Sequence, residues 1–378
     1  MKVAHISIIP AFSPGIFKKI EDKAKISREN NLGIDFYIIN PSFESHLENF
    51  HAIKVWNEKI PTNFLKKIVF RVFKITYIEK YIPLEKYDAI VLRYPLVDGF
   101  GTIKFFKKYG YKLFTEHHSD EISELFSVGR AVDIFRALLE KYFAKKILSN
   151  IKGIIGVTDE IRKLELAKIK KQIPSITIAN GINPESFSYT GFIPFDGKNL
   201  NLIFVASKFL PWHGLEKFLN LLEKYDGNVF IQLKLIGNLS NEQRKKIKQF
   251  NNKNVSIVSV GNVYGSDLDY HMKKSNLGIS SLALSKNKMQ EACPLKSREY
   301  IVRGIPFIYA YKDSDLNGDE LFAKRFKEDK ISLDAIIKFA IFVTSNKNQV
   351  EKNMEQYVDI VSWKNKLIKM KQFCKSVL

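Results

Sequence analysis

Apolar runs of strand length alternate with amphipathic segments of helix length along the whole chain. The first series has a helix predicted over 18–30, ending before Gly33, and strands predicted over 2–9, 35–39, 88–93, 111–115, 153–157 and 175–178. The second series has strands predicted over 201–205, 231–236, 255–258, 278–281 and 306–310, with helices over 214–224, 241–251, 268–274 and 295–303. Alternation of this kind is typical of parallel sheets built from βαβ units. We therefore predict an α/β protein with two doubly wound sheets.

A stretch of loop-forming residues divides the two series. Residues 188–199, SYTGFIPFDGKN, hold two glycines, a proline and several polar residues, as a linker does. The length of 378 residues also suits two domains better than one. We predict one Rossmann-like domain over 1–190 and another over 200–348, which face a central cleft. The basic, helical segment 349–378 is expected to cross back and pack on the first domain.

Charge and cysteine content narrow the classes of partner. The formal charge of +20 favours polyanions, such as phosphorylated substrates or an anionic membrane surface. Lysine supplies 50 of the 60 basic residues, so a compositional bias toward lysine explains the charge equally well. The sequence has neither zinc-finger spacing nor the aromatic and basic strands of an RNA-binding sheet, and we expect no nucleic-acid partner. Two cysteines give no disulfide framework, and the cytosol is the default compartment.

One segment, 64–74, mixes apolar and basic residues at helical spacing in the run FLKKIVFRVFK. Such a helix either lies in an anionic membrane surface or packs on the core with a solvated basic face. The apolar runs of the chain are strand-sized, far short of the roughly twenty residues of a membrane-spanning helix. We therefore expect a cytoplasmic protein that is peripheral to the inner face of the membrane through 64–74.

The most informative segment is 291–306, EACPLKSREYIVRGIP. Pro294 suits the start of a helix because its missing N–H would be unpaired there, and Gly304 with Pro306 suits the end. A helix from near Pro294 to Arg303 offers free backbone N–H groups at its start, which is a natural anion site. Lys296 is unfavourable for the helix dipole in that first turn, so it is either a ligand for an anion or a solvated lysine.

Two glutamates separated by seven residues, ahead of a short helix that ends in Gly-x-Pro, resemble the donor-site motif of retaining GT-B glycosyltransferases. The match is best with the large family four of nucleotide-sugar transferases, and PLKSREYIVRGIPFIYA resembles the branch that assembles bacterial surface polysaccharides. The resemblance implies that Glu291 contacts hydroxyls of the transferred sugar and acts in catalysis, and that Glu299 binds the ribose diol. It also implies a donor-binding helix start that comprises Ala292, Cys293, Pro294, Leu295 and Lys296.

The second matching segment is 204–214, FVASKFLPWHG, which follows the first strand of the second domain. The family carries Gly-Arg and then Lys-Gly here, and these cations neutralise the donor diphosphate. This chain has Ala206-Ser207-Lys208 and His213-Gly214 instead. The resemblance therefore implies a diphosphate role for Lys208 and His213. The alternative is a structural histidine that caps the turn.

The resemblance extends over nearly the whole chain and implies three further site residues. In KLFTEHHSD, residues 112–120, His117 aligns with a family histidine beside the anomeric carbon, with His118 as runner-up. The alternatives are a histidine pair that caps a strand or binds a metal with Glu116 and Asp120. Gly15, in the loop after the first strand, would lie near the donor phosphates. Val263 stands where the nucleotide base packs.

Two Asp-x-Asp sequences mimic the metal motif of the other glycosyltransferase fold. Helix capping explains 267–269, and a polar turn explains 313–315. No Gly-x-Gly-x-x-Gly follows a strand, which argues against a nicotinamide or flavin enzyme. We expect no metal and no cofactor, since GT-B enzymes generally offset the leaving diphosphate with a helix dipole and basic side chains.

Together these features predict a retaining glycosyltransferase of hexosyltransferase type. It would move a sugar from a nucleoside-diphosphate sugar to a glycan or lipid-linked acceptor in cell-surface polysaccharide assembly. A UDP-sugar is the expected donor and a GDP-sugar the second choice. The alternative, suggested by the altered diphosphate motif, is a non-catalytic GT-B subunit that binds a nucleotide-sugar or a partner enzyme.

Overall fold

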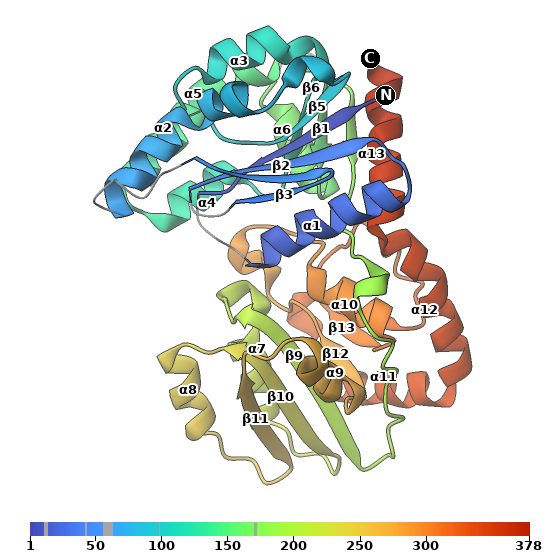
Figure 1. Ribbon diagram of the computed structural model, residues 1–378. Helices are drawn as coiled ribbons and strands as arrows, with labels where there is room; N and C mark the ends of the chain where they lie inside the picture. The colour runs from blue at the N-terminus through green and yellow to red at the C-terminus, as the bar shows by residue number, and fades with distance from the viewer. Residues whose placement is uncertain (11–13, 42–43, 56–62, 98, 170–171) are drawn as a thin grey trace. The chain divides into compact units, whose positions relative to one another are not determined.

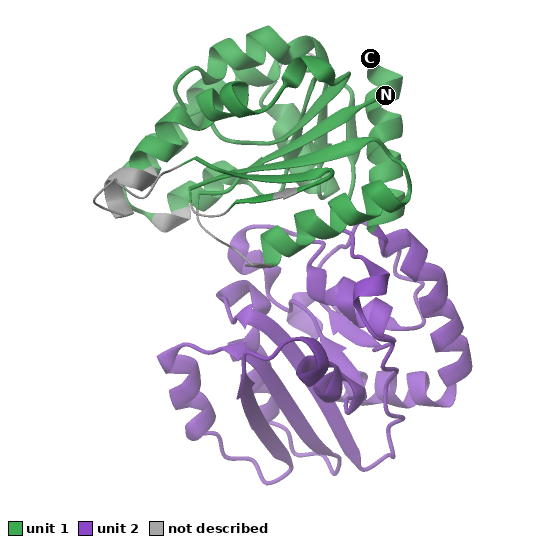
Figure 2. Ribbon diagram, viewed as in Figure 1, with its two compact units in different colours: residues 1–179, 363–378 green, residues 180–362 purple. Residues whose placement is uncertain are grey.

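The chain folds into two compact units, seen in a computed structural model that describes residues 1–10, 14–41, 44–55, 63–97, 99–169 and 172–378. Unit 1 comprises residues 1–179 and 363–378, and unit 2 comprises residues 180–362 (Figure 2). The division therefore falls after Ala179, ahead of the stretch 188–199 that looks like a linker. Residues 190–198 run along unit 2, where the Ile193 N–H donates to the Ser275 carbonyl at 3.1 Å.

Unit 1 is built on an eight-stranded sheet in the order β3-β4-β2-β1-β5-β6-β7-β8 (Figure 1). All neighbouring strands are parallel except the edge pair β3 and β4. The strands are β1 (Val3–Ile8), β2 (Ile34–Asn40), β3 (Ser45–Leu47), β4 (Phe50–Lys54), β5 (Ala89–Arg93), β6 (Leu113–His117), β7 (Gly153–Gly156) and β8 (Ser175–Thr177). The predicted doubly wound α/β architecture is confirmed, and β3 and β4 are additions to it.

Helices cover both faces of this sheet and close two separate hydrophobic cores. They are α1 (Pro14–Glu29), α2 (Asn63–Tyr81), α3 (Thr102–Tyr109), α4 (Glu121–Val128), α5 (Ala131–Leu148), α6 (Asp159–Ala167) and α13 (Trp363–Val377). One core lies under α1 and α13, where Phe17 and Leu367 pack on Val3. The other lies under α2, α3 and α5, where Phe70 and Phe105 pack on alternate residues of the same strands. The period of two along each strand thus sends neighbouring residues into different cores.

Unit 2 carries a six-stranded, fully parallel sheet in the order β11-β10-β9-β12-β13-β14. Its strands are β9 (Asn199–Lys208), β10 (Phe230–Asn238), β11 (Val255–Gly261), β12 (Leu277–Ile279), β13 (Phe307–Tyr309) and β14 (Ala323–Arg325). Its helices are α7 (Leu215–Glu223), α8 (Asn241–Lys248), α9 (Gly265–Lys273), α10 (Leu295–Arg303), α11 (Leu333–Ser345) and α12 (Lys347–Val361). Every predicted strand and helix of this half is present, and β14 and α11 are additions.

The basic segment 349–378 is two helices and not one. Ser362, in an extended conformation, separates α12 from α13. The division assigns α12 to unit 2 and α13 to unit 1, where Trp363 and Met370 enter the core under α1. The last helix therefore does return to the first unit, and it begins at residue 363.

Each sheet has one place where the strand order reverses. In unit 1 the chain winds outward from β1 through β2 on one side and from β5 through β6 on the other. In unit 2 the reversal lies between β9 and β12. Ligands of doubly wound sheets bind outside the carboxyl ends of the strands at such a reversal, so these two edges are the expected places for a site.

Candidate functional site

In unit 2, α10 starts after Pro294 and ends at Arg303, as the sequence predicts. Gly304 follows with φ of 76°, which favours glycine and ends the helix. A Cβ at this position would also lie 2.4 Å from the Tyr189 ring. The helix therefore has a fixed length, and its free N–H groups are held at one place.

Glu291 lies just before α10 and is held by Lys312. Its Oε1 is 2.7 Å from Lys312 Nζ, and the backbones of the two residues form a β-bridge. The Ala292 N–H donates to the Lys312 carbonyl at 3.0 Å, so this amide is used within the fold.

Buried polar groups behind α10 fix its orientation. Arg298 is fully buried and pairs with Asp313 and Asp315, and its Nε donates to the Asn180 carbonyl at 3.0 Å. Asn180 also donates through its side chain to the Cys293 carbonyl at 3.1 Å. The 313–315 sequence, expected to be a polar turn, thus neutralises Arg298, and the Cys293 side chain is buried beside it.

Lys296, in the first turn of α10, carries a buried ammonium group. Its Nζ is buried, it has no hydrogen-bond partner among the described residues, and it lies 5.0 Å from the centroid of the Phe204 ring on β9. Burial lowers the pKa of Lys296 to about 7. A buried ammonium without a partner is costly, so this position favours an anionic ligand.

His213 lies close enough to Lys296 to be affected by its charge. Burial and the charge of Lys296 lower the pKa of His213 to about 3, so the ring is neutral in the free protein. The Leu210 N–H donates to Nδ1 at 3.1 Å, which leaves Nε2 as the protonated donor. The Leu282 N–H, just beyond β12, donates to the His213 carbonyl at 3.0 Å. Lys208 ends β9 and is exposed.

Glu299, one turn inside α10, is tied into a small ionic network. Its Oε2 is 3.0 Å from Arg303, whose Nε is 2.9 Å from Asp269 Oδ1. Burial raises the pKa of Glu299, and Arg303 opposes that shift. Asp269 belongs to the first Asp-x-Asp sequence, for which helix capping was predicted. Instead it pairs with Arg303, and α9, the helix that contains it, has no side-chain cap. Val263 follows the edge strand β11 and is half-buried.

In unit 1 the two candidate histidines differ in burial: His117 is the last residue of β6, and His118 is the first residue beyond it. His117 is fully buried, with its ring stacked on Tyr94 at 4.5 Å. His118 is half-buried and lines a pocket. Of the two, His118 is therefore the one that borders a pocket. Gly15 lies in the first turn of α1 and is exposed.

His117 faces a cluster of buried charges. Its Nδ1 is 3.4 Å from Glu165 Oε2 and 3.5 Å from Glu121 Oε1, and the three side chains offer ligand atoms within 4.8 Å of one another. Lys168 donates to Glu165 at 2.5 Å and offsets one carboxylate. Burial raises the pKa of Glu121 to about 7 and lowers that of His117 to about 4, so a proton compensates the second carboxylate near neutral pH.

Glu116 and Asp120, weighed from sequence as metal ligands, are held by other groups. Glu116 accepts from His118 at 3.0 Å, lies 3.1 Å from His5, and is 3.4 Å from Lys23. Burial alone would raise the pKa of Glu116, but these basic neighbours outweigh it and hold the pKa well below its usual range. Asp120 caps α4 by accepting from the Ser123 N–H at 3.3 Å.

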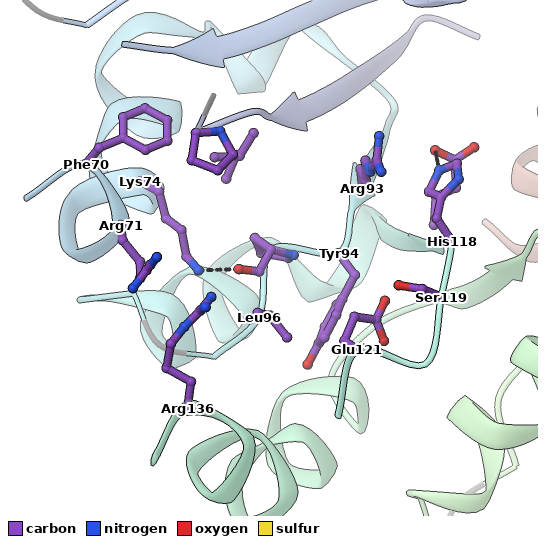
Figure 3. Close-up of a pocket in the computed structure, with 14 residues that line it drawn as sticks. Phe70, Arg71, Lys74, Arg93, Tyr94, Leu96, His118, Ser119, Glu121 and Arg136 are labelled. Carbon is purple, nitrogen blue, oxygen red and sulfur yellow. Dashed lines mark hydrogen bonds and ion pairs between the residues drawn. The ribbon is translucent and has the colours of Figure 1, made fainter. Parts of the chain in front are cut away.

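The pocket beside His118 lies at the strand reversal of unit 1 and has a volume of about 260 Å³ (Figure 3). It is lined by the chain just beyond β1, β5 and β6, and by side chains of α2 and α5. Four of its lining residues are basic: Arg71, Lys74, Arg93 and Arg136. Two of these, Arg71 and Lys74, belong to the segment 64–74, which the structure places within α2.

No protein-family model matches the sequence, and a search of the curated proteins gives no match. The structure is similar to solved ones along its whole length. A glycosyltransferase from Rickettsia africae aligns with a TM-score of 0.66 at 17% identity, over 100% of this chain and 98% of that one. Sucrose-phosphate synthase from Thermosynechococcus elongatus aligns with a TM-score of 0.64 at 14% identity, over 99% of both chains.

The Anabaena protein HepE, solved with UDP and glucose, aligns with a TM-score of 0.58 at 11% identity, over 99% of both chains. The chain has the GT-B fold. Identities at this level show the architecture alone, so the donor, the acceptor and the chemistry rest on this chain's own residues.

Proposed function

We propose that the protein is a glycosyltransferase that takes a sugar from a nucleoside-diphosphate sugar bound in unit 2. The observation that carries the proposal is the buried, unpartnered ammonium of Lys296 at the start of α10, with Glu291 before the helix and Glu299 one turn inside it. A diphosphate supplies the anion that this ammonium lacks, and the two carboxylates suit the hydroxyl groups at either end of such a ligand.

Each residue of the site then has a distinct task. Lys296 and the N–H groups at the start of α10 hold the diphosphate, and His213 donates to it through Nε2. Lys208, being exposed, adds a mobile positive charge. Glu299 accepts from the ribose diol, and Glu291, oriented by Lys312, accepts from hydroxyls of the transferred sugar. These donors are fixed before the reaction, which is how preorganised groups stabilise charge on a leaving diphosphate.

We also propose that transfer retains the anomeric configuration and needs no metal, as the resemblance to family four implies. The acceptor oxygen forms its bond to the anomeric carbon on the face that the diphosphate leaves, and the acceptor's proton passes to the departing phosphate oxygen. Of the two histidines that the resemblance indicates, His117 is fully buried against Tyr94 and the carboxylate cluster, whereas His118 borders the pocket of unit 1.

As the donor, a UDP-sugar is preferred to a GDP-sugar, because a protein of the same fold was solved with UDP and glucose. A glycan or lipid-linked acceptor in polysaccharide assembly remains the best proposal. The alternative is a GT-B subunit that binds a nucleotide-sugar without transfer, and it is favoured by Ala206 and Ser207 where the family has Gly-Arg.

The test is thermal unfolding with UDP, GDP and their sugars, on wild type and on Glu299→Ala. A ligand at about a hundred times its dissociation constant raises the unfolding free energy by about 2.7 kcal/mol. We expect a shift with UDP that Glu299→Ala reduces and that a chelator leaves unchanged. No shift with any nucleotide would overturn the proposal. Binding of a UDP-sugar without release of UDP in the presence of any acceptor would favour the alternative, a non-catalytic subunit.

A further inference from the structure

The buried cluster of His117, Glu121 and Glu165 contains polar atoms that lack hydrogen-bond partners. Nδ1 of His117, Oε2 of Glu121 and Oε2 of Glu165 are buried, and none of the three is hydrogen-bonded within the residues that the structure describes. The side chains of His117 and Glu165 are 0% exposed, and that of Glu121 is 13% exposed. Burial of such groups without partners is costly, so the cluster favours a ligand that binds between them.

Three elements of unit 1 bring these side chains together. His117 is the last residue of β6, Glu121 is the first residue of α4, and Glu165 lies on α6. Asp120 caps α4 by accepting from the Ser123 N–H, and Thr158 caps α6 by accepting from the Ile161 N–H at 3.2 Å. The start of each helix is therefore fixed, and the whole cluster belongs to one unit.

The distances within the cluster suit a metal ion better than direct hydrogen bonds. His117 Nδ1 is 3.4 Å from Glu165 Oε2 and 3.5 Å from Glu121 Oε1. Charge-assisted N–H···O hydrogen bonds are shorter, at about 2.7–2.9 Å. Zinc bonds to nitrogen and oxygen are about 2.0–2.2 Å long, so a tetrahedral site places neighbouring ligand atoms about 3.4 Å apart. The two distances are therefore those expected for ligands around one ion.

The hydrogen bond on the other side of the His117 ring also favours a metal ligand. Nε2 is 3.0 Å from Oγ1 of Thr115, whose side chain is fully buried. With its proton on Nε2, the ring donates to Thr115, and the lone pair of Nδ1 faces the two carboxylates. Metal-bound histidines ordinarily donate their second ring nitrogen in this way, which fixes the tautomer. Tyr94, stacked on the ring at 4.5 Å, holds the plane of the imidazole.

The charge around the cluster matches that of a divalent cation. Lys168 Nζ is 2.5 Å from Oε1 of Glu165, the oxygen other than the one nearest His117. Its charge also acts on Glu121 and on Glu140, a third buried carboxylate. One ammonium group against three carboxylates leaves two negative charges, which a single divalent ion offsets.

We propose that His117, Glu121 and Glu165 bind a divalent transition-metal ion, for which zinc is the best fit. Imidazole nitrogen suits zinc, whereas magnesium and calcium prefer oxygen ligands alone. Three protein ligands leave the fourth position of a tetrahedral zinc site to water. Glu121 also lines the pocket of unit 1, so the pocket is the path by which the ion and this water enter. The ion joins β6 to α4 and α6, a structural role that is independent of the transfer reaction.

The carboxylates of this site differ from those that the sequence indicated. Glu116 and Asp120 are the acidic neighbours of the histidine pair along the chain, but Glu116 is paired with the ammonium of Lys23 at 3.4 Å, which disfavours a second cation there. Glu165 comes from a later βαβ unit and belongs to no motif. Its contact with His117 therefore becomes visible only in the folded chain.

The test is titration calorimetry on the full chain, freed of metal with a chelator and kept without nucleotide. The ions are Zn²⁺, Mn²⁺ and Mg²⁺. Co²⁺ is a spectroscopic probe, because it absorbs visible light far more strongly in a tetrahedral site than in an octahedral one. The test variant is Glu121→Gln, whose amide imitates a protonated carboxyl group. The matched control is Glu124→Gln, which removes an exposed carboxylate one turn further along α4.

We expect wild type and the control to bind one Zn²⁺ per chain, at least about tenfold more tightly than Mn²⁺. Glu121→Gln should bind Zn²⁺ at least about tenfold more weakly and lose the strong visible absorption of Co²⁺. A second variant, Thr115→Val, removes the acceptor of the His117 Nε2 proton but no ligand, and should weaken Zn²⁺ binding by about tenfold. Zn²⁺ should raise the unfolding temperature of wild type and control more than that of either variant.

Two results would overturn the metal site. One is the absence of Zn²⁺ binding by wild type; a proton would then compensate the cluster, and Glu121→Gln would keep the stability of wild type. The other is equal Zn²⁺ affinity in wild type, Glu121→Gln and Thr115→Val, because the ion would then lie elsewhere on the chain. Neither result bears on the donor site, since no nucleotide is present in these titrations.

Discussion

At the strand reversal of unit 1, the carboxylate of Glu116 is paired with three basic side chains. In unit 2, by contrast, the ammonium of Lys296 has no hydrogen-bond partner within the described part of the chain. Both groups are buried at the carboxyl edge of a doubly wound sheet. The first network compensates its own charge and therefore contributes to folding. The second is left uncompensated and therefore favours a ligand. Protein groups thus compensate the buried charge at one reversal, whereas at the other we propose that a bound anion does so.

The largest expected effect comes from breaking the compensated network. Glu116→Gln leaves the ammonium of Lys23, which is 2% exposed, without its counter-charge. Removal of one partner of a buried ion pair typically costs about 3–5 kcal/mol. We expect a loss of unfolding free energy of that size in urea. Glu21→Gln, which removes an exposed carboxylate beside Lys18, is the control and should change stability by about 0.5 kcal/mol or less.

Replacement of Lys296, the uncompensated group, is expected to change the unfolding free energy in the opposite direction. Lys296→Met removes a buried charge without leaving a partner behind, so the free protein should gain about 1 kcal/mol or more in unfolding free energy. The same variant should bind UDP at least about tenfold more weakly. A variant that loses stability would make Lys296 a structural lysine, and the contrast between the two reversals would fail.

The pH dependence of UDP binding sharpens the same point. The pKa of Lys296 is lowered to about 7 in the free protein, and a bound diphosphate raises it, because the anion favours the charged form. Binding then takes up a proton above that pH. The affinity should be full below pH 7 and fall by up to about tenfold per pH unit above it. Titration calorimetry across pH 6 to 9 measures this change in affinity, and Lys296→Met should reduce the dependence of the affinity on pH.

The smallest effect is expected at Glu299, because Arg303 keeps Asp269 as a second partner when the carboxylate is lost. Glu299→Gln should weaken the binding of UDP by about 0.5–1 kcal/mol and leave the binding of pyrophosphate unchanged, since pyrophosphate has no ribose. For 2′-deoxy-UDP the variant and wild type should differ less. A loss that is equal for UDP and pyrophosphate would place Glu299 on the phosphates.

Much of the fold was predictable because its signals are local. The alternation of strands and helices, the bounds of α10 and the left-handed Gly304 all follow from neighbouring residues. The strands β3, β4 and β14 were not predicted, since three to five residues carry too little of the alternating pattern of a strand to be recognised. For the site, local motifs indicated Glu291, Lys296 and Glu299. The residues that hold them, Lys312, Asp313 and Asn180, lie in other segments and carry no motif.

The sequence by itself determined the two doubly wound units, the helix α10 with Pro294 before it and Gly304 after it, and the glutamates around it, because periodicity, proline and glycine act within a few residues. Only the tertiary structure decided which buried charges are compensated by protein groups and which are not. Packing buried His117, brought His118 to the pocket and paired Glu116 with Lys23. It left the Lys296 ammonium without a hydrogen-bond partner among the residues that the structure describes. Burial and compensation depend on groups that meet from distant parts of the chain, and they set the electrostatic character of a site.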